Sequence, residues 1–202
     1  MGNRRREGVT PKENALRIIR FDHPERVMGA PPVHSIKYRG NDHAGYEGGG
    51  HDCAVATEWT DIWGVRWRKI ADGVMGFHVG HPIAAPEDLK HFTPPDPDDE
   101  RVCGLIYEMA DAFKNDPDRD HKFLGGRHRE TLLEKANTLM GMEALFVAFK
   151  AEPNFVKDVF RMVMDFHLSI AKHYASVGIE YAGLGDDLGT QTAPQISPAM
   201  YR

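Results

Sequence analysis

Apolar residues recur at helical spacing along much of the chain, and the longest such pattern predicts a helix over 153–176. Thr10 and Glu13 have the spacing of a capping box, with Pro11 suited to the first turn, so another helix is expected to begin there. Shorter amphipathic patterns predict further helical segments over 86–89, 98–115, 130–140 and 143–150.

Short apolar runs between these segments predict strands. One run covers 179–184, and a second covers 121–127 and includes a glycine pair. The stretch 59–68 has two interpretations, because tryptophans spaced by four residues would share a helix face, whereas 64–67 also fits a strand. A short strand that follows a helix and ends in polar residues is typical of α/β folds, which is the fold class we predict.

The amino-terminal quarter gives weaker signals. Residues 1–9 are predicted to be a disordered tail. Residues 26–28 fit a short strand, and 29–50, rich in Gly, Pro, His and Asn, are predicted to form a loop or flexible insertion.

Composition narrows the class of protein. The 202-residue chain is 41% hydrophobic and 27% charged, as in ordinary globular proteins. Its net charge of −5 and pI of about 6.1 argue against a nucleic-acid partner. No apolar run reaches the roughly 18 residues of a membrane span, and no secretory signal is evident. The only cysteines, Cys53 and Cys103, imply no disulfide framework, so the reducing cytoplasm is the expected location.

Candidate chemistry follows the predicted strand over 179–184. Asp186 and Asp187 stand where that strand ends, and the carboxyl ends of parallel strands carry the active sites of α/β proteins. Two adjacent carboxylates resist full ionisation in a shared site, so the pair is a candidate for proton transfer, with Gln191 as a nearby donor and acceptor. A solvated turn capped by Asp187 explains the same residues equally well.

Three further residues are candidates. Asp61 is flanked by aromatic and aliphatic side chains that would raise its pKa, although an aspartate that caps a turn fits the pattern too. The tryptophans beside it, including Trp63, suit packing, with contact to a substrate as the alternative. Arg127 and Arg129 could hold an anionic group or could be solvated near a turn.

We assign no metal ligand in this chain. His51 and Cys53 have the spacing of a two-ligand clip, but a closed zinc site needs four ligands and no second cysteine pair exists. The sequence also contains no phosphate-binding Walker loop, no dinucleotide-binding glycine motif after a strand and no nucleophile elbow.

Several stretches resemble the uroporphyrinogen decarboxylase superfamily, which includes the methylcobamide:coenzyme M methyltransferases and related corrinoid-dependent demethylases. The resemblance extends from Thr10 to the end of the chain and is carried by residues 59–64, 82–97, 139–143, 185–191 and 196–198. It implies a (β/α)8 barrel, which typically needs roughly 250 residues. The expected fold is therefore a partial TIM barrel with an amino-terminal helical and loop extension, in which 10–202 form the front part of the domain and the carboxyl-terminal half is absent.

The start of a last helix leads to the same expectation. Ser197 and Pro198 fit the cap and first position of a helix, yet only four residues follow Pro198. A helix needs roughly 12 to 15 residues for even marginal independent stability.

The resemblance also implies roles for residues. Asp61 is similar to the aspartate that lies beneath the tetrapyrrole ring in the decarboxylases. Their arginine-rich segment has no counterpart in Ala30–Ile36, which lacks arginine, so the methyltransferase-like branch fits better. In that branch zinc is bound by a His-x-Cys pair and a distant Cys in the carboxyl-terminal half, and a corrinoid donates the methyl group.

The leading prediction is thus an enzyme of corrinoid-linked methyl transfer or demethylation, present here as a fragment that is inactive alone. Decarboxylation of a tetrapyrrole acid is one alternative, and a non-catalytic half-barrel that assembles with a second copy as a homodimer is another. We expect a small-molecule or corrinoid-protein substrate and no membrane or nucleic-acid partner. The predicted catalytic residues are Asp61, Asp186 and Asp187, and the predicted substrate-binding residues are Gln191, Arg127 and Trp63.

Overall fold

The computed structural model describes residues 8–201, so most of the predicted tail, 1–7, lies outside the described part. The chain enters its first helix, α1 (Pro11–Arg20), through the predicted cap, since Thr10 Oγ1 accepts a hydrogen bond from the Glu13 N–H at 3.1 Å. The helix ends at Phe21, whose φ of 56° is left-handed.

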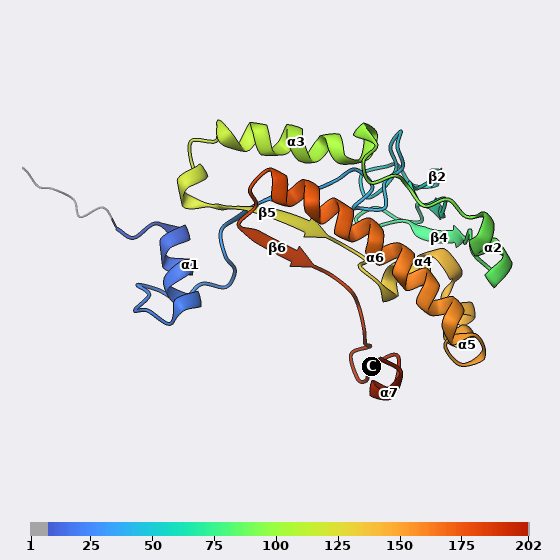
Figure 1. The fold of residues 1–202 in the computed structure, drawn as a ribbon. Coiled ribbons are helices and arrows are strands. Elements are labelled where there is room, and N and C mark those ends of the chain that lie inside the picture. Colours follow the sequence, from blue (N-terminus) through green and yellow to red (C-terminus); the bar gives the residue numbers. More distant parts are fainter. Residues whose placement is uncertain (1–7, 202) are drawn as a thin grey trace, which may run out of the picture.

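A parallel sheet of three strands forms the centre of the fold (Figure 1). Its strands occur in chain order and all run the same way, so their carboxyl ends meet at one edge of the sheet. In register, Val33 is opposite Phe123 and Gly125 is opposite Tyr181. The strands are β1 (Val33–Ile36), β5 (Phe123–His128) and β6 (Tyr181–Leu184).

The first of these strands corrects the sequence prediction. The strand expected at 26–28 is absent and Val27 is 95% exposed, whereas β1 lies inside the predicted loop, 29–50. Polar His34 and Ser35 weaken the apolar signal of β1, and pairing with β5 rather than local propensity determines its conformation.

A second, antiparallel sheet lies between β1 and β5 in the chain. It consists of β2 (Glu58–Thr60), β3 (Arg66–Arg68) and β4 (Phe77–Gly80). Of the two interpretations of 59–68, the strand is confirmed for β3, because Asp61 to Gly64 form a turn in which Gly64 has a φ of 79°. That left-handed conformation suits glycine and is incompatible with a continuous helix.

The helices largely follow the sequence pattern. The prediction for 153–176 is confirmed residue for residue, whereas α4 begins three residues later than predicted because Glu130 has a φ of 51°. The remaining helical elements are α2 (Pro86–His91), α3 (Glu100–Lys114), the 3₁₀ turn η1 (Arg119–His121), α4 (Leu133–Met140), α5 (Met142–Ala151), α6 (Pro153–Ser176) and α7 (Pro198–Tyr201).

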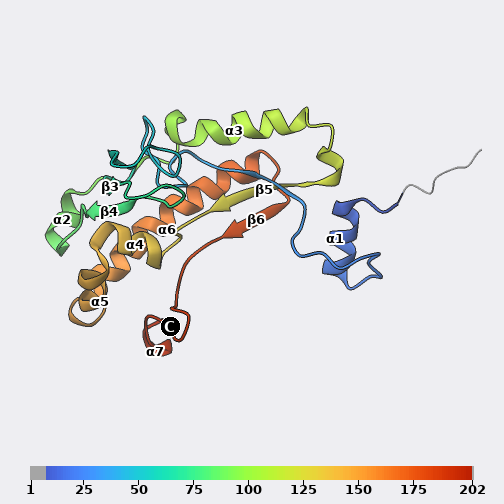
Figure 2. The ribbon, with the colours of Figure 1, turned by 180° about the vertical axis from the view of Figure 1, so that it is seen from behind.

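Helices α3 and α6 pack beside the parallel sheet, as both ribbon views show (Figures 1 and 2). The contact between α6 and β5 is close, since a Cβ on Gly126 would lie 2.7 Å from the Tyr174 ring. A glycine in β5 therefore lets the helix approach the sheet. Beyond β6 the chain leaves the sheet and ends in the short α7.

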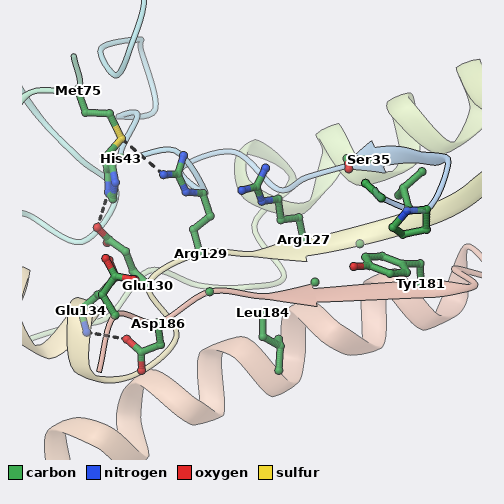
Figure 3. Close-up of a pocket in the computed structure, with 17 residues that line it drawn as sticks. Ser35, His43, Met75, Arg127, Arg129, Glu130, Glu134, Tyr181, Leu184 and Asp186 are labelled. Carbon is green, nitrogen blue, oxygen red and sulfur yellow. Dashed lines mark hydrogen bonds and ion pairs between the residues drawn. The ribbon is translucent and has the colours of Figure 1, made fainter. Parts of the chain in front are cut away.

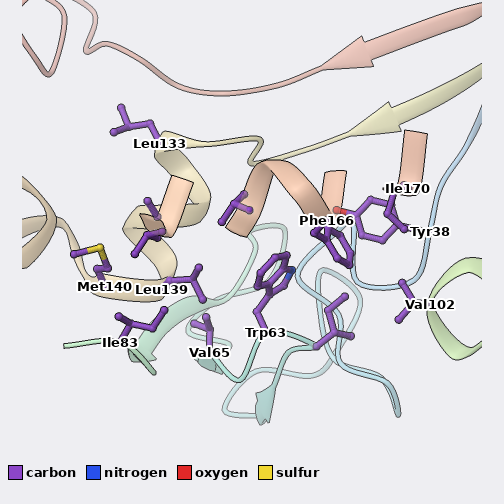
Figure 4. Packing of buried hydrophobic residues seen from close by; sticks show 14 of the residues in the cluster. Tyr38, Trp63, Val65, Ile83, Val102, Leu133, Leu139, Met140, Phe166 and Ile170 are labelled. Atoms are coloured by element: carbon purple, nitrogen blue, oxygen red, sulfur yellow. The ribbon is translucent and has the colours of Figure 1, made fainter. Parts of the chain in front are cut away.

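One hydrophobic core joins the two sheets and the helices (Figure 4). Trp63, only 2% exposed, packs edge-on against Phe166 of α6 with ring centroids 4.8 Å apart. Ile83 and Leu139 extend the same cluster towards α4. The fold is therefore a mixed α/β structure in which, among residues 8–201, the parallel strands form an open sheet and no closed barrel. Within that range no helix combines the length and apolar character needed to cross a bilayer.

Candidate functional site

A hollow of about 510 Å³ runs along one face of the parallel sheet and reaches the carboxyl ends of β1, β5 and β6 (Figure 3). It lies on the face of the sheet opposite α6, because Gly126 faces Tyr174 of that helix while its neighbours Gly125 and Arg127 point the other way. Side chains from all three strands line it, among them Val33, Ser35, Arg127, Tyr181 and Leu184.

Asp186, predicted to be catalytic, lines this hollow and also holds the start of α4. Its Oδ2 accepts hydrogen bonds from the N–H groups of Leu132 (3.1 Å) and Leu133 (2.9 Å). Its Oδ1 accepts one from the N–H of Glu134 (2.8 Å). The carboxylate therefore supplies acceptors for amides that a helix start leaves free, and it favourably faces the positive end of the helix. Asp187, the other member of the predicted pair, lines the same hollow and is exposed.

The other predicted residues lie elsewhere. Asp61 is 5% exposed in the turn between β2 and β3. Its carboxylate accepts hydrogen bonds from the N–H groups of Trp63 (2.8 Å) and Val65 (3.0 Å) and from Trp67 Nε1 (2.9 Å). Burial raises the pKa of Asp61, and the charge of Lys135 and these three donors oppose the rise. The turn-capping interpretation thus accounts for the contacts of this carboxylate.

Trp63 and Gln191 are not among the residues that line the hollow. Trp63 belongs to the core and to a separate surface depression beside the β2–β3 turn, which also contains Asp61. Gln191 is exposed in the irregular segment between β6 and α7. Of the six predicted residues, Arg127, Asp186 and Asp187 meet at the strand ends.

The basic side of the hollow is formed by Arg127 and Arg129, which point the same way from the end of β5 (Figure 3). Arg129 is anchored, because its guanidinium lies 3.4 Å from Asp42 and 3.8 Å from the sulfur of Met75. Within residues 8–201, no acidic side chain lies within ion-pair distance of Arg127. An exposed guanidinium without an internal partner is free to bind an anion.

Acidic groups face the arginines across the hollow. Glu134 and Asp187 line it, and burial followed by the charges of Glu130, Asp187 and Asp186 raises the pKa of Glu134. The hollow therefore has a cationic side that suits an anion and an acidic side that suits a cationic or hydrogen-bonding group.

A buried charge cluster that sequence reasoning missed lies at the inner end of the hollow. His43 and Glu130 both line the hollow, and His43 Nδ1 is 3.0 Å from Glu130 Oε1. The other carboxylate oxygen is 2.6 Å from Nζ of Lys135, which is 2% exposed. Both are close contacts rather than well-aligned hydrogen bonds, because neither has the angle of an ordinary hydrogen bond.

The neighbours of Glu130 determine the pKa of its carboxyl group. Burial alone would raise the pKa of Glu130, but the ammonium of Lys135 and then His43 outweigh it and lower that pKa to about 2. Glu130 is therefore a carboxylate at every physiological pH.

Backbone strain accompanies the cluster. His43 and Glu130 have φ values of 61° and 51°, left-handed conformations that cost a residue with a side chain on the order of 1 kcal/mol or more. Surrounding contacts hold the strained loop, since the His43 ring stacks on Trp67 at 4.6 Å and its carbonyl accepts a hydrogen bond from Trp59 Nε1. Strain of this kind is typical of functional sites, where the fold fixes an otherwise unfavourable geometry.

A second histidine pair lies behind the sheet. His128 of β5 and His167 of α6 are buried with their Nδ1 atoms 3.0 Å apart, so one ring must donate and the other accept. Burial lowers the pKa of His128 to about 4, and burial together with the neighbouring His128 and Lys135 lowers that of His167 to about 3. Both rings are therefore neutral at physiological pH.

Metal-ligating side chains are not clustered in the described part of the chain. Across residues 8–201, no three His, Cys, Asp or Glu side chains are grouped so as to hold a metal ion. His51 and Cys53 are not joined by a third ligand, and the thiol of Cys53 donates to the carbonyl of Gly50 at 3.2 Å. We derive no chemical step from zinc in this chain.

Comparison with known proteins gave no match to a family, to a curated protein or to a solved structure. The chemistry that this site can carry out must therefore be inferred from its own geometry. Two arginines line the hollow, of which Arg129 is anchored by Asp42 and Arg127 is not paired within residues 8–201. His43, next to the Glu130 carboxylate, and several further carboxyl groups line the same hollow. Such a set can bind a small anion and move a proton.

Proposed function

We propose that the hollow binds a small anionic substrate and that the chain is part of an enzyme of the uroporphyrinogen decarboxylase type, which acts in corrinoid-linked methyl transfer or demethylation. The observation that carries the proposal is the placement of Arg127 and Arg129 at the carboxyl ends of parallel strands. Active sites of parallel α/β sheets occupy this edge, and paired guanidinium groups favour carboxylates, phosphates and sulfonates.

The barrel expected from the family resemblance belongs to the same proposal. In this proposal, β1, β5 and β6 are three consecutive strands of a (β/α)8 barrel, and the antiparallel sheet is an insertion between β1 and β5. Support comes from their parallel pairing in chain order and from the helices that connect them. Sequential parallel strands with helical crossovers are the building units of such barrels.

Decarboxylation of a tetrapyrrole acid remains the alternative within the family. Two observations favour methyl transfer over it. Asp61, which would accept the pyrrole N–H groups, already accepts three intramolecular hydrogen bonds. Ala30 and Pro31 line the hollow where decarboxylases would supply arginine to hold a polyacid. The proposal takes a corrinoid, free or protein-bound, as the methyl donor, and the cytoplasm as the location.

A binding experiment tests the anion site. We expect 2-mercaptoethanesulfonate, an anionic thiol of the kind that accepts methyl groups, to bind the chain in a calorimetric titration. Arg127→Gln should weaken binding roughly 10- to 100-fold, because a hydrogen bond to a charged group contributes about 1.5–3 kcal/mol. Arg161→Gln is the matched control, since Arg161 pairs with Asp158 on the surface of α6.

The titration also separates the two activities. Uroporphyrin, a polycarboxylate analogue of the decarboxylase substrate, is titrated in parallel. Tighter binding of the porphyrin, with equal loss in Arg127→Gln, would favour decarboxylation. Equal affinities of wild type and Arg127→Gln for both probes would refute the anion site itself.

A second candidate function is assembly through β6. Among residues 8–201 this strand pairs only with β5, so it forms an edge of the parallel sheet, and Leu184 and Tyr181 on it are 75% and 41% exposed. An edge strand with exposed apolar side chains is a surface on which another chain can pair. In this proposal a second copy covers the edge and the chain acts as a half-barrel assembly module.

A further inference from the structure

His43 is the side chain of the hollow best arranged to move a proton. Its Nδ1 lies 3.0 Å from a carboxylate oxygen of Glu130. Among residues 8–201, no hydrogen-bond partner reaches its other ring nitrogen, Nε2, although the ring lines the hollow. When the proton of the neutral imidazole is on Nδ1, where it faces this carboxylate oxygen, the lone pair of the ring is on Nε2, which is the arrangement of a histidine base.

Glu130 is fixed for this task. Its side chain is about nine-tenths buried, and Lys135 binds the oxygen that does not face His43. Lys135 in turn is enclosed, with its ammonium 5.6 Å from the centre of the Trp63 ring. Lys135 thus orients the Glu130 carboxylate, the carboxylate orients His43, and the His43 ring lines the hollow.

The backbone supports the same arrangement from both sides. His43 and Glu130 are 87 positions apart, and both have left-handed φ angles. The two segments are tied together directly, since the N–H of Arg129 donates to Oδ1 of Asn41 at 3.1 Å. Both partners of this side-chain pair therefore have strained backbones, and the loops that carry them place the imidazole and the carboxylate side by side.

We infer that His43 is the general acid–base of the strand-end hollow and that Glu130 is its positioning residue, with Lys135 holding Glu130. The inference deepens the proposed function and depends on it for the substrate, an anion bound by Arg127 and Arg129. In the forward direction the Nε2 lone pair takes a proton from the substrate or from water, the electron pair of the broken bond stays on the atom that loses the proton, and the Glu130 carboxylate balances the charge of the imidazolium. In the reverse direction Nε2 returns that proton.

The tautomer of His43 tests the inference without a substrate. In ¹⁵N-labelled protein, at a pH well above the ordinary histidine pKa of about 6.5, we expect long-range ¹H–¹⁵N spectra to show the proton on Nδ1 and none on Nε2. In Glu130→Gln, Lys135 should bind the amide oxygen, so the amide NH₂ faces Nδ1 and the proton should move to Nε2. A switch of tautomer is a result that mere packing would not produce.

Two controls accompany this measurement. His51, which is exposed beside Asp52, should keep its tautomer in both proteins and serves as the internal reference. Lys135→Met keeps the carboxylate and should leave His43 with its Nδ1 proton. Wild-type protein with the proton on Nε2, or an unchanged tautomer in folded Glu130→Gln, would overturn the inference. The wild-type spectrum decides the matter even if Glu130→Gln does not fold.

Addition of 2-mercaptoethanesulfonate separates this inference from the proposed function. If both hold, the probe should shift the Arg127 side-chain signal and the His43 Nε2 signal together, and Arg127→Gln should abolish both shifts. A shift at Arg127 with none at His43 would keep the anion site and overturn the acid–base role. If the probe shifts neither signal, the anion site fails, and the tautomer decides whether the His43–Glu130 pair survives as a positioned base.

Discussion

At the scale of single residues, the contacts of each acidic side chain separate structural carboxylates from available ones. Asp61 and Asp186 each accept three hydrogen bonds from N–H groups of the chain. Asp187 and Glu134 also line the hollow, but among residues 8–201 no such set of three N–H donors occupies either carboxyl group. Carboxylates with three internal donors hold the fold, so the reactive groups must be found among the remaining side chains.

The neutral pair His128–His167 predicts a loss of stability in mild acid. Both folded-state pKa values, about 4 and about 3, lie below the value of 6.5 expected in the unfolded chain. Below pH 6.5 the unfolded chain therefore binds protons that the folded chain does not, and stability falls as the pH falls towards 4. Between pH 7 and pH 5 we expect the free energy of unfolding, measured with urea, to drop by roughly 2–4 kcal/mol.

Substitution of one partner checks this assignment. His167→Gln should remove about half of the pH dependence in that window. His121→Gln, at an exposed position before β5, should leave the slope as in wild type. A wild-type free energy of unfolding that is constant between pH 7 and pH 5 would contradict the assignment.

The candidate residues found by sequence reasoning were those with a local signal. Arg127 is next to the last residue of β5, and Asp186 and Asp187 lie two and three residues after the end of β6, so their position at the edge of the sheet could be predicted; their roles remain predictions. His43 and Glu130 carry no such signal, because their contact depends on pairing between β1 and β5. Their left-handed backbones also break the local pattern, and this explains why Glu130 was assigned to a helix.

At the scale of elements, the cap that Asp186 provides joins β6 to α4 and shapes the hollow between them. We expect Asp186→Ala to destabilise the protein by roughly 1–2 kcal/mol, since three helix-start amides lose their acceptor. Thermal unfolding gives the magnitude, and hydrogen exchange at Leu133 and Glu134 should accelerate. Asp187→Ala, one residue away and exposed, is the control and should change stability by less than about 0.5 kcal/mol. Equal effects of the two substitutions would show that the cap contributes nothing.

The elements differ in how far their sequences specify them. Helix α6 was predicted to the residue, because Pro153 opens it and a continuous apolar stripe runs to Tyr174. Strand β1 was not predicted, because it has only four residues, two of them polar, within a Gly- and Pro-rich region. So short a segment shows no clear alternation of apolar and polar residues. The β2–β3 turn was ambiguous because tryptophan spacing of four residues fits a helix, and only the left-handed Gly64 decides for a hairpin.

At the scale of the whole molecule, the free edge of the parallel sheet predicts self-association. We expect light scattering to give the mass of a dimer for the wild-type chain and Leu184→Lys to raise the dissociation constant at least about tenfold, because the lysine places a charge on the pairing edge. Val147→Lys on α5 is the control, since Val147 is also exposed, at 62%, but lies away from β6. A wild-type chain that stays monomeric at the highest soluble concentration would exclude the assembly proposal.

The pairing of β1 with β5 also has a consequence for synthesis on the ribosome. Val33 and its partner Phe123 are separated by 90 positions, and in the described part of the chain β1 has no other strand partner in the parallel sheet. At about 5–20 residues per second, translation of that interval takes on the order of 5–20 seconds, during which the nascent chain carries an unpaired strand. The central sheet must therefore form late, after the segment between β1 and β5 has emerged, and until then β1 is accessible to chaperones that bind extended segments.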